Sequence, residues 1–491
     1  MLEKSSRVEL TIENLAYGGK GVARLGGFVV FVDGAVPGDR VAARIVRKKS
    51  DFAEAVIEEV IEPSPHRVEP PCPLFGACGG CSALHLAYEE QLNQKANQVR
   101  EALARIGRQS DLQIAPIRPS PVIHRYRNKM DFTFGTNSDG QLAIGLHRRG
   151  EYAGIVDVER CWLQPERFDR AVAVVRDFAR RSSLPAYSQR THKGFWRHLI
   201  LRHSVAEDRI LIVLITTPGE LAGLDRLVEE LAAAAARPAG LVWAINDSVA
   251  DVAACQEVRF QWGEQVLQER VGRLQFRVSP MSFFQVNTRA TEGLHDCVVE
   301  FAEPNSATTL LDAYCGTGSI GICCASQFAR VIGIESVRES VWNARENAAL
   351  NGLTNCTFLC GPVNRTVALA RSFAGGRFGR VVVDPPRGGM DKRALAQLLD
   401  LRPNVMVYVS CNPATLARDV LAISEAGYEI ERVQPFDLFP HTPHVEMVIK
   451  FVRKGGVNNP VGSAKSKTRE LARGSFGAGG SSAVGGRTPG E

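Results

Sequence analysis

Apolar and polar residues follow three different periods along the chain. Between Val8 and about Glu62, short runs of alternating apolar and polar residues are separated by glycines and prolines, which is typical of a small β-barrel. From Leu86 to about Gly272, a helix with a 3.6-residue apolar period precedes several alternating strands, which indicates a mixed α+β region. After residue 276, buried strands alternate with helical stretches, which indicates a doubly wound α/β sheet.

These periods divide the 491 residues into four parts. We predict a β-barrel at residues 1–62, a central domain at 63–275, an α/β domain at 276–453 and a disordered tail at 454–491. Three folded parts agree with a usual domain size of ~100–200 residues. The tail is rich in Gly, Ser, Lys and Arg, and such a composition cannot bury enough apolar surface to fold.

Composition and charge narrow the classes of protein. No stretch approaches the ~20 apolar residues of a membrane span, and the first ten residues lack the apolar core of a secretory signal. We therefore expect a soluble, cytoplasmic protein, in which the 12 cysteines serve as metal ligands, catalytic groups or core residues rather than disulfides. The net charge of +6 is compatible with a polyanionic partner without requiring one.

Basic residues gather in segments that suit RNA. The barrel segment has Arg44, Arg47, Lys48 and Lys49 close together, and residues 126–129 and 147–149 interleave basic with aromatic or polar groups. Such segments can contact the phosphate backbone and the bases of RNA. The alternative is an ordinary charged surface exposed to solvent.

Four cysteines have the spacing of a metal centre. Cys72, Cys78 and Cys81 are spaced C-x5-C-x2-C, and Cys161 follows far along the chain. Four thiolates suit either a tetrahedral zinc ion or an iron–sulfur cluster. The x5 gap is wider than in most zinc sites, and the glycine pair before Cys81 leaves room for backbone near cluster sulfurs, which favours iron–sulfur. A set of free cysteines is the other alternative.

The α/β part contains a glycine-rich turn of the kind that binds nucleotides. Gly316 and Gly318 separate a buried strand from a helix, and the next buried strand ends at Glu335, whose carboxylate can accept hydrogen bonds from two ribose hydroxyls. A third strand ends at Asp384, and the two prolines that follow fix the backbone there. The sequence D-x-Y-C-G-x-G resembles motif I of S-adenosylmethionine (SAM) methyltransferases more than the G-x-G-x-x-G of nicotinamide-binding enzymes.

A fourth buried strand, at residues 405–410, ends on Cys411. Ligands of doubly wound sheets collect outside the carboxyl ends of the strands, so this thiol is placed for chemistry and we interpret it as a nucleophile. A cysteine considered alone is more often a small buried apolar residue, which is the alternative.

Taken together, these motifs resemble the RNA (uracil-C5)-methyltransferase family over residues 1–453. The motifs that carry the resemblance are Gln285 in RVSPMSFFQVN, DAYCGTGS, IES, DPPRGG, VSCNPATLARD and FPHTPHVEMV. The N-terminal YGGKGVAR and VPGDRV resemble the TRAM domain, an RNA-binding barrel. With this barrel and the cysteine pattern, the chain is most similar to the bacterial 23S rRNA enzymes.

The resemblance implies a Rossmann-like SAM-dependent fold with a TRAM/OB-like barrel and a mixed α+β central domain, and it implies a role for particular residues. Cys411 would be the nucleophile and Glu446 the base. The implied SAM contacts are Gln285, Tyr314, Ser319, Glu335 and Asp384. The implied ligands of a [4Fe-4S] cluster, with a structural or RNA-orienting role, are Cys72, Cys78, Cys81 and Cys161. Two positions depart from the family: Ser319 stands where some members carry Asn, and residues 360–363 lack an acidic residue often found there.

The implied chemistry explains why these residue types are needed. Uracil C5 is too weak a nucleophile to attack a methyl sulfonium, but addition of a thiolate to C6 produces an enolate with electron density at C5. After the methyl group is transferred, a base must remove the C5 proton before the thiolate can leave. The target base must first be extruded from folded RNA.

We therefore expect a monomeric cytoplasmic enzyme that forms 5-methyluridine, with 23S rRNA as its partner and no membrane contact. A tRNA (uracil-C5)-methyltransferase, which would share the catalytic motifs, is one alternative. A non-catalytic RNA-binding assembly factor is another, and the presence of both Cys411 and Glu446 argues against it.

Overall fold

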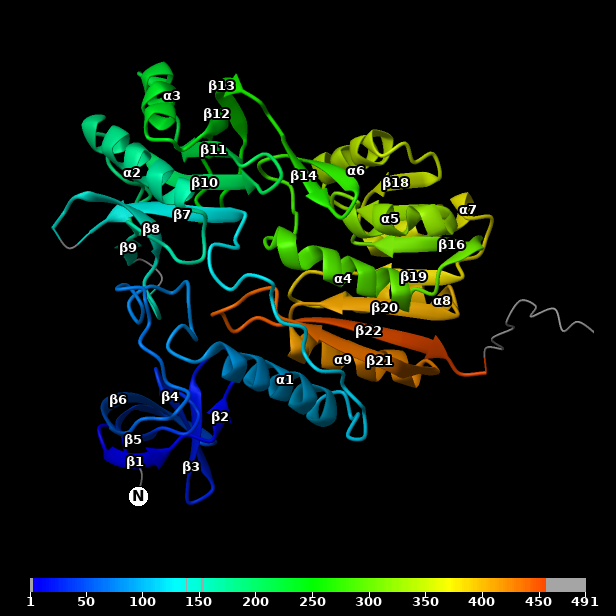
Figure 1. Ribbon diagram of the computed structural model, residues 1–491, viewed down its shortest axis with the longest axis horizontal. Coiled ribbons are helices and arrows are strands. Elements are labelled where there is room, and N and C mark those ends of the chain that lie inside the picture. The colour runs from blue at the N-terminus through cyan, green and yellow to red at the C-terminus, as the bar shows by residue number, and fades with distance from the viewer. Residues whose placement is uncertain (1–2, 138, 152–153, 456–491) are drawn as a thin grey trace, which may run out of the picture. The chain divides into compact units, whose positions relative to one another are not determined.

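Four β-sheets occur in the described part of the chain, and each is built from strands that follow one another in sequence (Figure 1). The computed structural model describes residues 3–137, 139–151 and 154–455. Residues up to Lys454 form one compact unit. Apart from its first two positions, the predicted tail at 454–491 lies outside the described residues.

The first sheet is a curled, half-barrel arrangement of six strands in the order β1-β5-β6-β4-β3-β2. Its strands are β1 (Arg7–Thr11), β2 (Asn14–Leu15), β3 (Gly21–Leu25), β4 (Phe28–Asp33), β5 (Arg40–Lys48) and β6 (Phe52–Glu62). All neighbouring strands are antiparallel except β4 and β6. Side chains on one face of these strands, among them Leu10, Val30 and Val41, share one buried core. This agrees with the period of two, in which successive side chains point to opposite faces. The predicted small β-fold is confirmed.

The second sheet has seven strands in the order β13-β12-β11-β10-β7-β8-β9. Its elements are β7 (Lys129–Thr136), β8 (Leu142–His147), β9 (Ile155–Asp157), α2 (Glu166–Arg181), β10 (Trp196–Ser204), β11 (Arg209–Thr216), α3 (Leu224–Ala233), β12 (Pro238–Ile245) and β13 (Glu257–Gly263). Helices α2 and α3 cover one face of this sheet (Figure 1). A two-stranded sheet, β14 (Leu267–Val271) and β15 (Leu274–Val278), follows.

The α/β sheet also has seven strands, in the order β18-β17-β16-β19-β20-β22-β21. Its strands are β16 (Asn305–Ala313), β17 (Phe328–Glu335), β18 (Cys356–Cys360), β19 (Arg380–Val383), β20 (Val405–Ser410), β21 (Tyr428–Phe436) and β22 (Glu446–Arg453). The first five in spatial order run parallel, and β22 is antiparallel to both of its neighbours, β20 and β21. This arrangement confirms the predicted Rossmann-like sheet.

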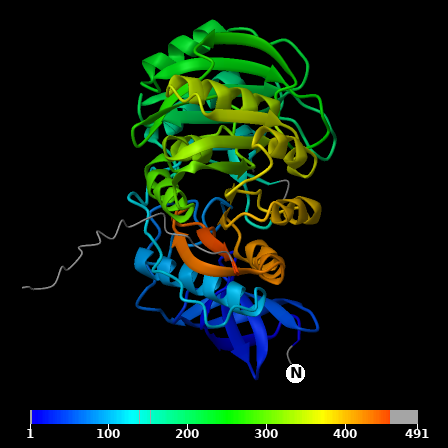
Figure 2. The ribbon, with the colours of Figure 1, turned by 90° about the vertical axis from the view of Figure 1, so that its right-hand side faces the viewer.

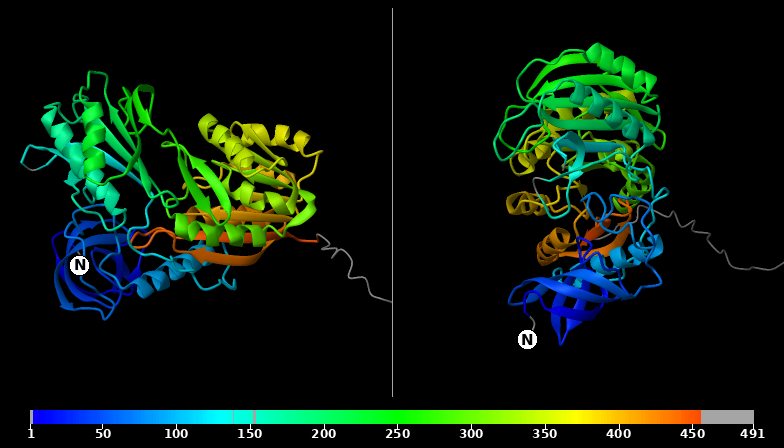
Figure 3. Two further views of the ribbon diagram at one scale, coloured as in Figure 1. Left: turned by 45° about the horizontal axis from the view of Figure 1, so that its top comes forward. Right: turned by 90° about the vertical axis from the view of Figure 1, so that its left-hand side faces the viewer.

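Helices lie on both faces of the α/β sheet, as Figures 2 and 3 show. They are α4 (Thr288–Phe301), α5 (Ser319–Cys324), α6 (Arg338–Leu350), α7 (Val363–Phe373), α8 (Lys392–Asp400) and α9 (Pro413–Glu425), with a 3₁₀ turn at Ala325–Gln327. One core contains residues of α7, α8 and α9, and the opposite core contains residues of α4 and α5. Burial on both faces explains why strands such as VMVYVS read as continuous apolar runs.

Helix α1 (Tyr88–Arg105) packs differently from what its sequence position suggests. It lies in the segment predicted as the central domain, yet Val99 and Leu103 belong to the α/β core and the helix packs against α9. This helix therefore joins segments that the sequence assigns to different parts. No helix in residues 3–137, 139–151 and 154–455 is both long and apolar enough to cross a bilayer.

Candidate functional site

The carboxyl ends of four adjacent parallel strands bring the predicted residues together. In spatial order, Glu335 ends β17, Tyr314 follows β16, Asp384 follows β19 and Cys411 follows β20. Glu446 begins β22, the antiparallel neighbour of β20, so it lies at the same edge of the sheet. Five residues from distant parts of the sequence thus surround one end of the sheet, where ligands of such sheets bind.

The turn between β16 and α5 is shaped by residues with positive φ. Tyr314, Gly316 and Gly318 have φ values of 65°, 54° and 81°. A Cβ atom on Gly318 would lie 3.0 Å from both Ala344 and Phe358, so the turn packs closely on its neighbours. Ser319 begins α5 directly after this turn. The predicted glycine-rich turn is therefore present between strand and helix.

The Glu335 carboxylate is fixed against this turn by backbone donors. It accepts hydrogen bonds from Gly316 N at 3.2 Å and from Val337 N at 2.8 Å. These contacts hold the carboxylate at the edge of the glycine-rich turn, where a ribose-bearing ligand would meet it.

Asp312 is a further acidic group that the sequence analysis did not select. It is fully buried in β16, and its Oδ2 atom accepts a hydrogen bond from Gly321 N at 2.8 Å, whereas Oδ1 has no partner among the described residues. Burial, with smaller contributions from Asp384 and Glu335, raises the pKa of Asp312 to about 8. Its position two residues before Tyr314 in the glycine-turn motif was the signal that could have identified it.

Acidic groups dominate the electrostatics of this edge. Burial raises the pKa of Asp384 to about 7. Burial also raises the pKa of Glu446, which is 2% exposed, well above its usual range; Asp384 adds to this shift and Arg387 opposes it. Together with Asp312 and Glu335, four carboxyl groups lie at this edge. A ligand with a positive charge would favour the ionised forms of Asp312, Asp384 and Glu446.

Cys411 is partly exposed at this edge. Burial raises the pKa of its thiol to about 12, with Glu446 adding to the shift and Arg387 opposing it. The thiolate is the reactive form of cysteine, so this thiol needs a nearby positive charge or a proton acceptor before it can react.

The residues after Cys411 explain why its strand ends there. The Asn412 side chain caps α9 by accepting a hydrogen bond from Ala414 N at 3.1 Å, and Pro413 occupies the first helical position. The Asn412 amide also donates to Arg387 O at 3.2 Å. The SCNP segment is thereby tied to the DPPR segment.

The loop before Glu446, residues 437–445, is held by segments from much earlier in the chain. His441 N donates to Gln91 Oε1 of α1 at 2.9 Å, and His441 O accepts from Ser82 N and Ala83 N at 3.0 and 3.1 Å. Further contacts are the ion pair of Lys95 with Asp437 at 2.6 Å, and hydrogen bonds from Tyr126 to Pro440 O and from Asn287 to Leu438 O, both at 3.0 Å. The start of β22 is therefore fixed by α1 and by the segment that follows Cys81.

Gln285 lies just before α4 and is buried. Its carbonyl accepts a hydrogen bond from Asn128 Nδ2 at 2.8 Å, while the nearby Phe283 ring lies 3.9 Å from the position that a Cβ on Gly316 would take. The segment that carries Gln285 therefore neighbours the glycine-rich turn.

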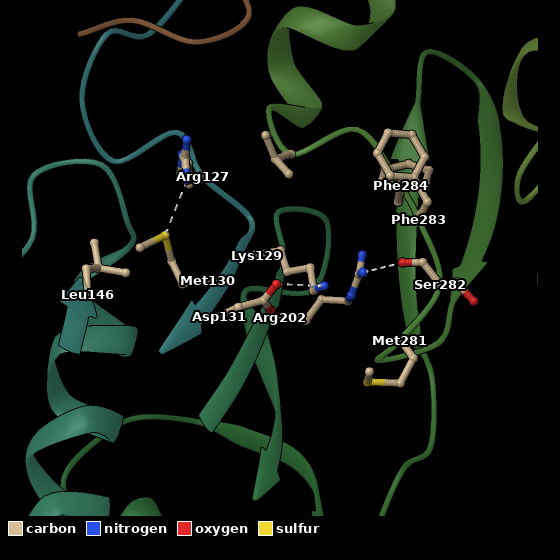
Figure 4. Close-up of a pocket in the computed structure, with 11 residues that line it drawn as sticks. Arg127, Lys129, Met130, Asp131, Leu146, Arg202, Met281, Ser282, Phe283 and Phe284 are labelled. Atoms are coloured by element: carbon tan, nitrogen blue, oxygen red, sulfur yellow. Dashed lines mark hydrogen bonds and ion pairs between the residues drawn. The ribbon is translucent and has the colours of Figure 1, made fainter. Parts of the chain in front are cut away.

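A pocket beside this segment is lined by residues in and next to the second sheet and by residues between β15 and α4 (Figure 4). Arg127, Lys129 and Arg202 supply its basic groups, and Met281 and Phe283 are among its apolar ones. Of residues 126–129, Tyr126 and Asn128 are buried and hydrogen bonded within the protein, so only Arg127 and Lys129 line the pocket. Residues 126–128 lie in the loop before β7, and the hydrogen bonds of Tyr126 and Asn128 explain why half of this predicted RNA-contacting segment faces inward.

The four predicted metal ligands line one cavity. Cys72, Cys78, Cys81 and Cys161 surround it together with apolar residues that include Leu74, Phe75, Leu84 and Leu163. Within the described ranges, no three His, Cys, Asp or Glu side chains have an arrangement that could hold a metal ion. The structure therefore brings the four predicted cysteines to one apolar cavity without the geometry of a metal site among the described residues.

The thiol of Cys81 and the backbone of Gly80 lie at the wall of this cavity. Burial, with contributions from Cys161 and Cys78, raises the pKa of Cys81 to about 12. Gly80 N contacts Cys78 Sγ at 3.4 Å, and a Cβ on Gly80 would lie 2.9 Å from Leu146 Cδ1. Burial therefore favours the neutral thiol at Cys81, and a positively charged group in the cavity would favour the thiolate.

Comparisons with known proteins give consistent matches. The family model described as tRNA (Uracil-5-)-methyltransferase matches residues 255–454, and the TRAM domain model matches residues 2–57. An uncharacterized RNA methyltransferase of Caldanaerobacter subterraneus is 39% identical over 449 residues, covering 91% of this chain and 99% of the relative. Another, from Halalkalibacterium halodurans, is 37% identical over 447 residues, covering 91% and 97%.

A solved structure is similar over most of the chain. The crystal structure of Pyrococcus abyssi tRNA (uracil-54, C5)-methyltransferase in complex with S-adenosyl-L-homocysteine matches with a TM-score of 0.73 and 27% identity. The match covers 91% of this chain and 100% of that chain.

Proposed function

The chain belongs to the RNA (uracil-5)-methyltransferase family, and from this premise we propose that it forms 5-methyluridine in 23S rRNA by covalent catalysis through Cys411. The observation that carries the proposal is the placement of Cys411, directly after β20, near Glu446, the first residue of the neighbouring strand β22, beside the acidic end of the sheet. We further propose that the enzyme acts in the cytoplasm as a monomer.

The methyl donor suits the acidic edge of the sheet. SAM, when bound, supplies an electrophilic methyl group on a positively charged sulfur. The residues that would hold it are Gln285, Tyr314, Ser319, Glu335 and Asp384. Asp312 holds α5 in place by accepting a hydrogen bond from Gly321 N. A cation beside these carboxyl groups would also lower the pKa of Cys411, because it stabilises the thiolate.

Two residues of the chain perform the steps on the base. The Cys411 thiolate forms a bond to uracil C6, and the electron pair of the C5–C6 double bond moves into the enolate, which makes C5 nucleophilic. Once C5 has received the methyl group, Glu446 takes the C5 proton and the C6–sulfur bond breaks, which restores the double bond and releases the thiolate. Because burial raises the pKa of Glu446, its carboxylate is a stronger base than an exposed glutamate.

The substrate RNA has two candidates. The half-barrel and the four-cysteine cavity support 23S rRNA, because the resemblance to the bacterial 23S rRNA enzymes rests on these features. A tRNA substrate is favoured by the structural match to a protein named as a tRNA (uracil-54, C5)-methyltransferase.

Transfer of a radiolabelled methyl group to unmodified 23S rRNA and to unmodified tRNA, in parallel, tests the proposal. We expect label in 23S rRNA, on C5 of uridine, and only background in tRNA. Label in tRNA alone would establish tRNA as the substrate. Label in neither RNA, with both transcripts folded, would support a non-catalytic RNA-binding factor and refute the proposed reaction.

We also propose that the four-cysteine cavity holds a [4Fe-4S] cluster with a structural role. Anaerobically purified protein should be brown and contain iron and acid-labile sulfide in equal amounts. Cys78→Ser should remove most of the iron, whereas Cys360→Ser, a change at an exposed cysteine outside the cavity, should retain it. One zinc ion per chain in place of iron and sulfide would show that this assignment is wrong.

A further inference from the structure

One turn of the half-barrel extends toward the proposed catalytic residues. The turn lies between β2 and β3 and is closed by hydrogen bonds from Ala16 N to Lys20 O and from Gly19 N to Ala16 O, both 2.9 Å long. Gly18 and Gly19 have φ values of 105° and 87°, which favour glycine. Tyr17 lies in this turn and is 43% exposed.

Tyr17 contacts the loop that leads to Glu446. Its hydroxyl lies 3.4 Å from Nδ1 of His444, two residues before Glu446, and the two ring centroids are 6.4 Å apart. On the other side of the imidazole, His444 Nε2 lies 3.3 Å from Nη2 of Arg387. A continuous row of side chains therefore runs from the half-barrel to the segment that follows Asp384. It consists of Tyr17, His444 and Arg387, and we call it the rim.

The rim lies close to the proposed nucleophile and base. Burial raises the pKa of Tyr17, and the negative charges of Cys411 and Glu446 add to the shift while Arg387 opposes it. These directions agree with the contacts above, because the interaction between two charges weakens with distance. A residue from the first twenty positions of the chain thus stands beside groups that lie about four hundred positions later.

Helix α1 holds Tyr17 and the Glu446 loop in place together. Gln94 Oε1 accepts from Leu15 N at 2.9 Å, and Gln98 donates to Leu15 O at 3.0 Å, which fixes the start of the Tyr17 turn. Two other residues of the same helix, Gln91 and Lys95, bind His441 and Asp437. Because one rigid helix anchors both segments, the distance between Tyr17 and Glu446 is set by the fold rather than by a flexible linker.

Gly19, in the same turn, packs against Ser82. A Cβ on Gly19 would lie 2.7 Å from the Cβ of Ser82, whose backbone N–H donates to His441 O. The turn, the segment after Cys81 and the Glu446 loop therefore pack on one another directly.

We propose that Tyr17 is a substrate-positioning residue: its ring packs against the extruded uridine or the nucleotide beside it, and its hydroxyl orients His444 at the rim. The inference rests on the proposed function, because it assigns the half-barrel a place in the same site. A half-exposed aromatic ring suits this role, since unpaired RNA bases stack on such rings. Arg387 adds a positive charge at the rim, which suits the phosphates that flank an extruded nucleotide.

The test compares Tyr17→Ala and Tyr17→Phe with a matched control. Tyr187 forms a similar pair elsewhere, with its hydroxyl 3.2 Å from His192 Nδ1 and ring centroids 6.4 Å apart, so Tyr187→Ala removes an equivalent contact far along the sequence. For each protein we would measure kcat and KM for RNA, the affinity for SAM, and the melting temperature.

We expect Tyr17→Ala to raise KM for RNA by about tenfold, the size of a lost base–aromatic stack, with SAM affinity and melting temperature unchanged. Tyr17→Phe should keep a KM near that of the wild type, because the ring remains, and should lower kcat because His444 loses its partner. Tyr187→Ala should resemble the wild type.

Two outcomes would overturn the inference. In the first, Tyr17→Ala has the same KM and kcat as the wild-type enzyme. In the second, its melting temperature and SAM affinity fall together with its activity, which would mean that Tyr17 only fastens the half-barrel. Failure of the proposed function is distinguishable from both, because the wild-type protein would then transfer no methyl group to uridine.

Discussion

Replacing Cys411 by alanine should abolish methyl transfer to RNA while SAM still binds. Without the thiol no bond to uracil C6 can form, and C5 then lacks the electron density to accept the methyl group, so we expect a loss of at least roughly 10³-fold. Radiolabelled methyl transfer measures the loss, and titration calorimetry measures SAM binding. The side chain is only partly buried at the end of β20, so the strand and its core should tolerate the change.

Cys360→Ala is the matched control for this variant. Cys360 is also the end residue of a parallel strand, β18, at the same edge of the sheet, but it is exposed and is not adjacent to Glu446. We expect its activity to be close to that of the wild type. Substantial turnover by Cys411→Ala would refute the covalent route, whereas equal losses in both variants would point to a general disturbance of the sheet edge.

Glu446→Gln should trap the enzyme on its RNA. Glutamine has the same shape but cannot accept the C5 proton, so the bond between Cys411 and uracil C6 persists after the methyl group has been transferred. The expected result is a band of lower mobility on a denaturing gel that depends on both RNA and SAM. In the double variant Cys411→Ala, Glu446→Gln the band should be absent, and normal turnover by Glu446→Gln would mean that another group removes the proton.

The same variant should change how stability depends on pH. Burial raises the pKa of Glu446 in the folded protein, so the protonated side chain contributes to the free energy of unfolding. This stability is fully present below the unfolded pKa of about 4.3 and is lost as pH rises through the folded pKa. Glutamine does not ionise, so the Glu446→Gln variant does not lose this stability. Chemical denaturation at several pH values should therefore show Glu446→Gln gaining stability over the wild type toward alkaline pH.

The sequence predicted the strand-end residues well for a geometric reason. Parallel strands place their carboxyl ends at one edge, so recognising the strands that end at Glu335, Asp384 and Cys411 was enough to predict that these groups meet. Tyr314 could be placed in the same way, because its strand leads into a glycine-rich turn with a recognisable spacing.

Other parts of the site depend on contacts that local periodicity does not encode. The packing of α1 on α9, the hold of Gln91 on His441 and the approach of Tyr17 to His444 all join segments hundreds of residues apart. An apolar period indicates that a face is buried, but not which distant element buries it. The role of Asp312 was missed because an acidic residue inside a buried strand gives no pattern beyond the motif that surrounds it.

The place of β22 has a consequence for the timing of biosynthesis. This strand follows β21 in sequence but lies between β20 and β21 in the sheet, and Glu446 is its first residue. A nascent chain on the ribosome already carries Cys411, the proposed nucleophile, before β22 with Glu446, the proposed base, has been translated. The sheet can gain β22 only after residue 453 has emerged, so an incomplete polypeptide would lack the group proposed to release a bound nucleotide.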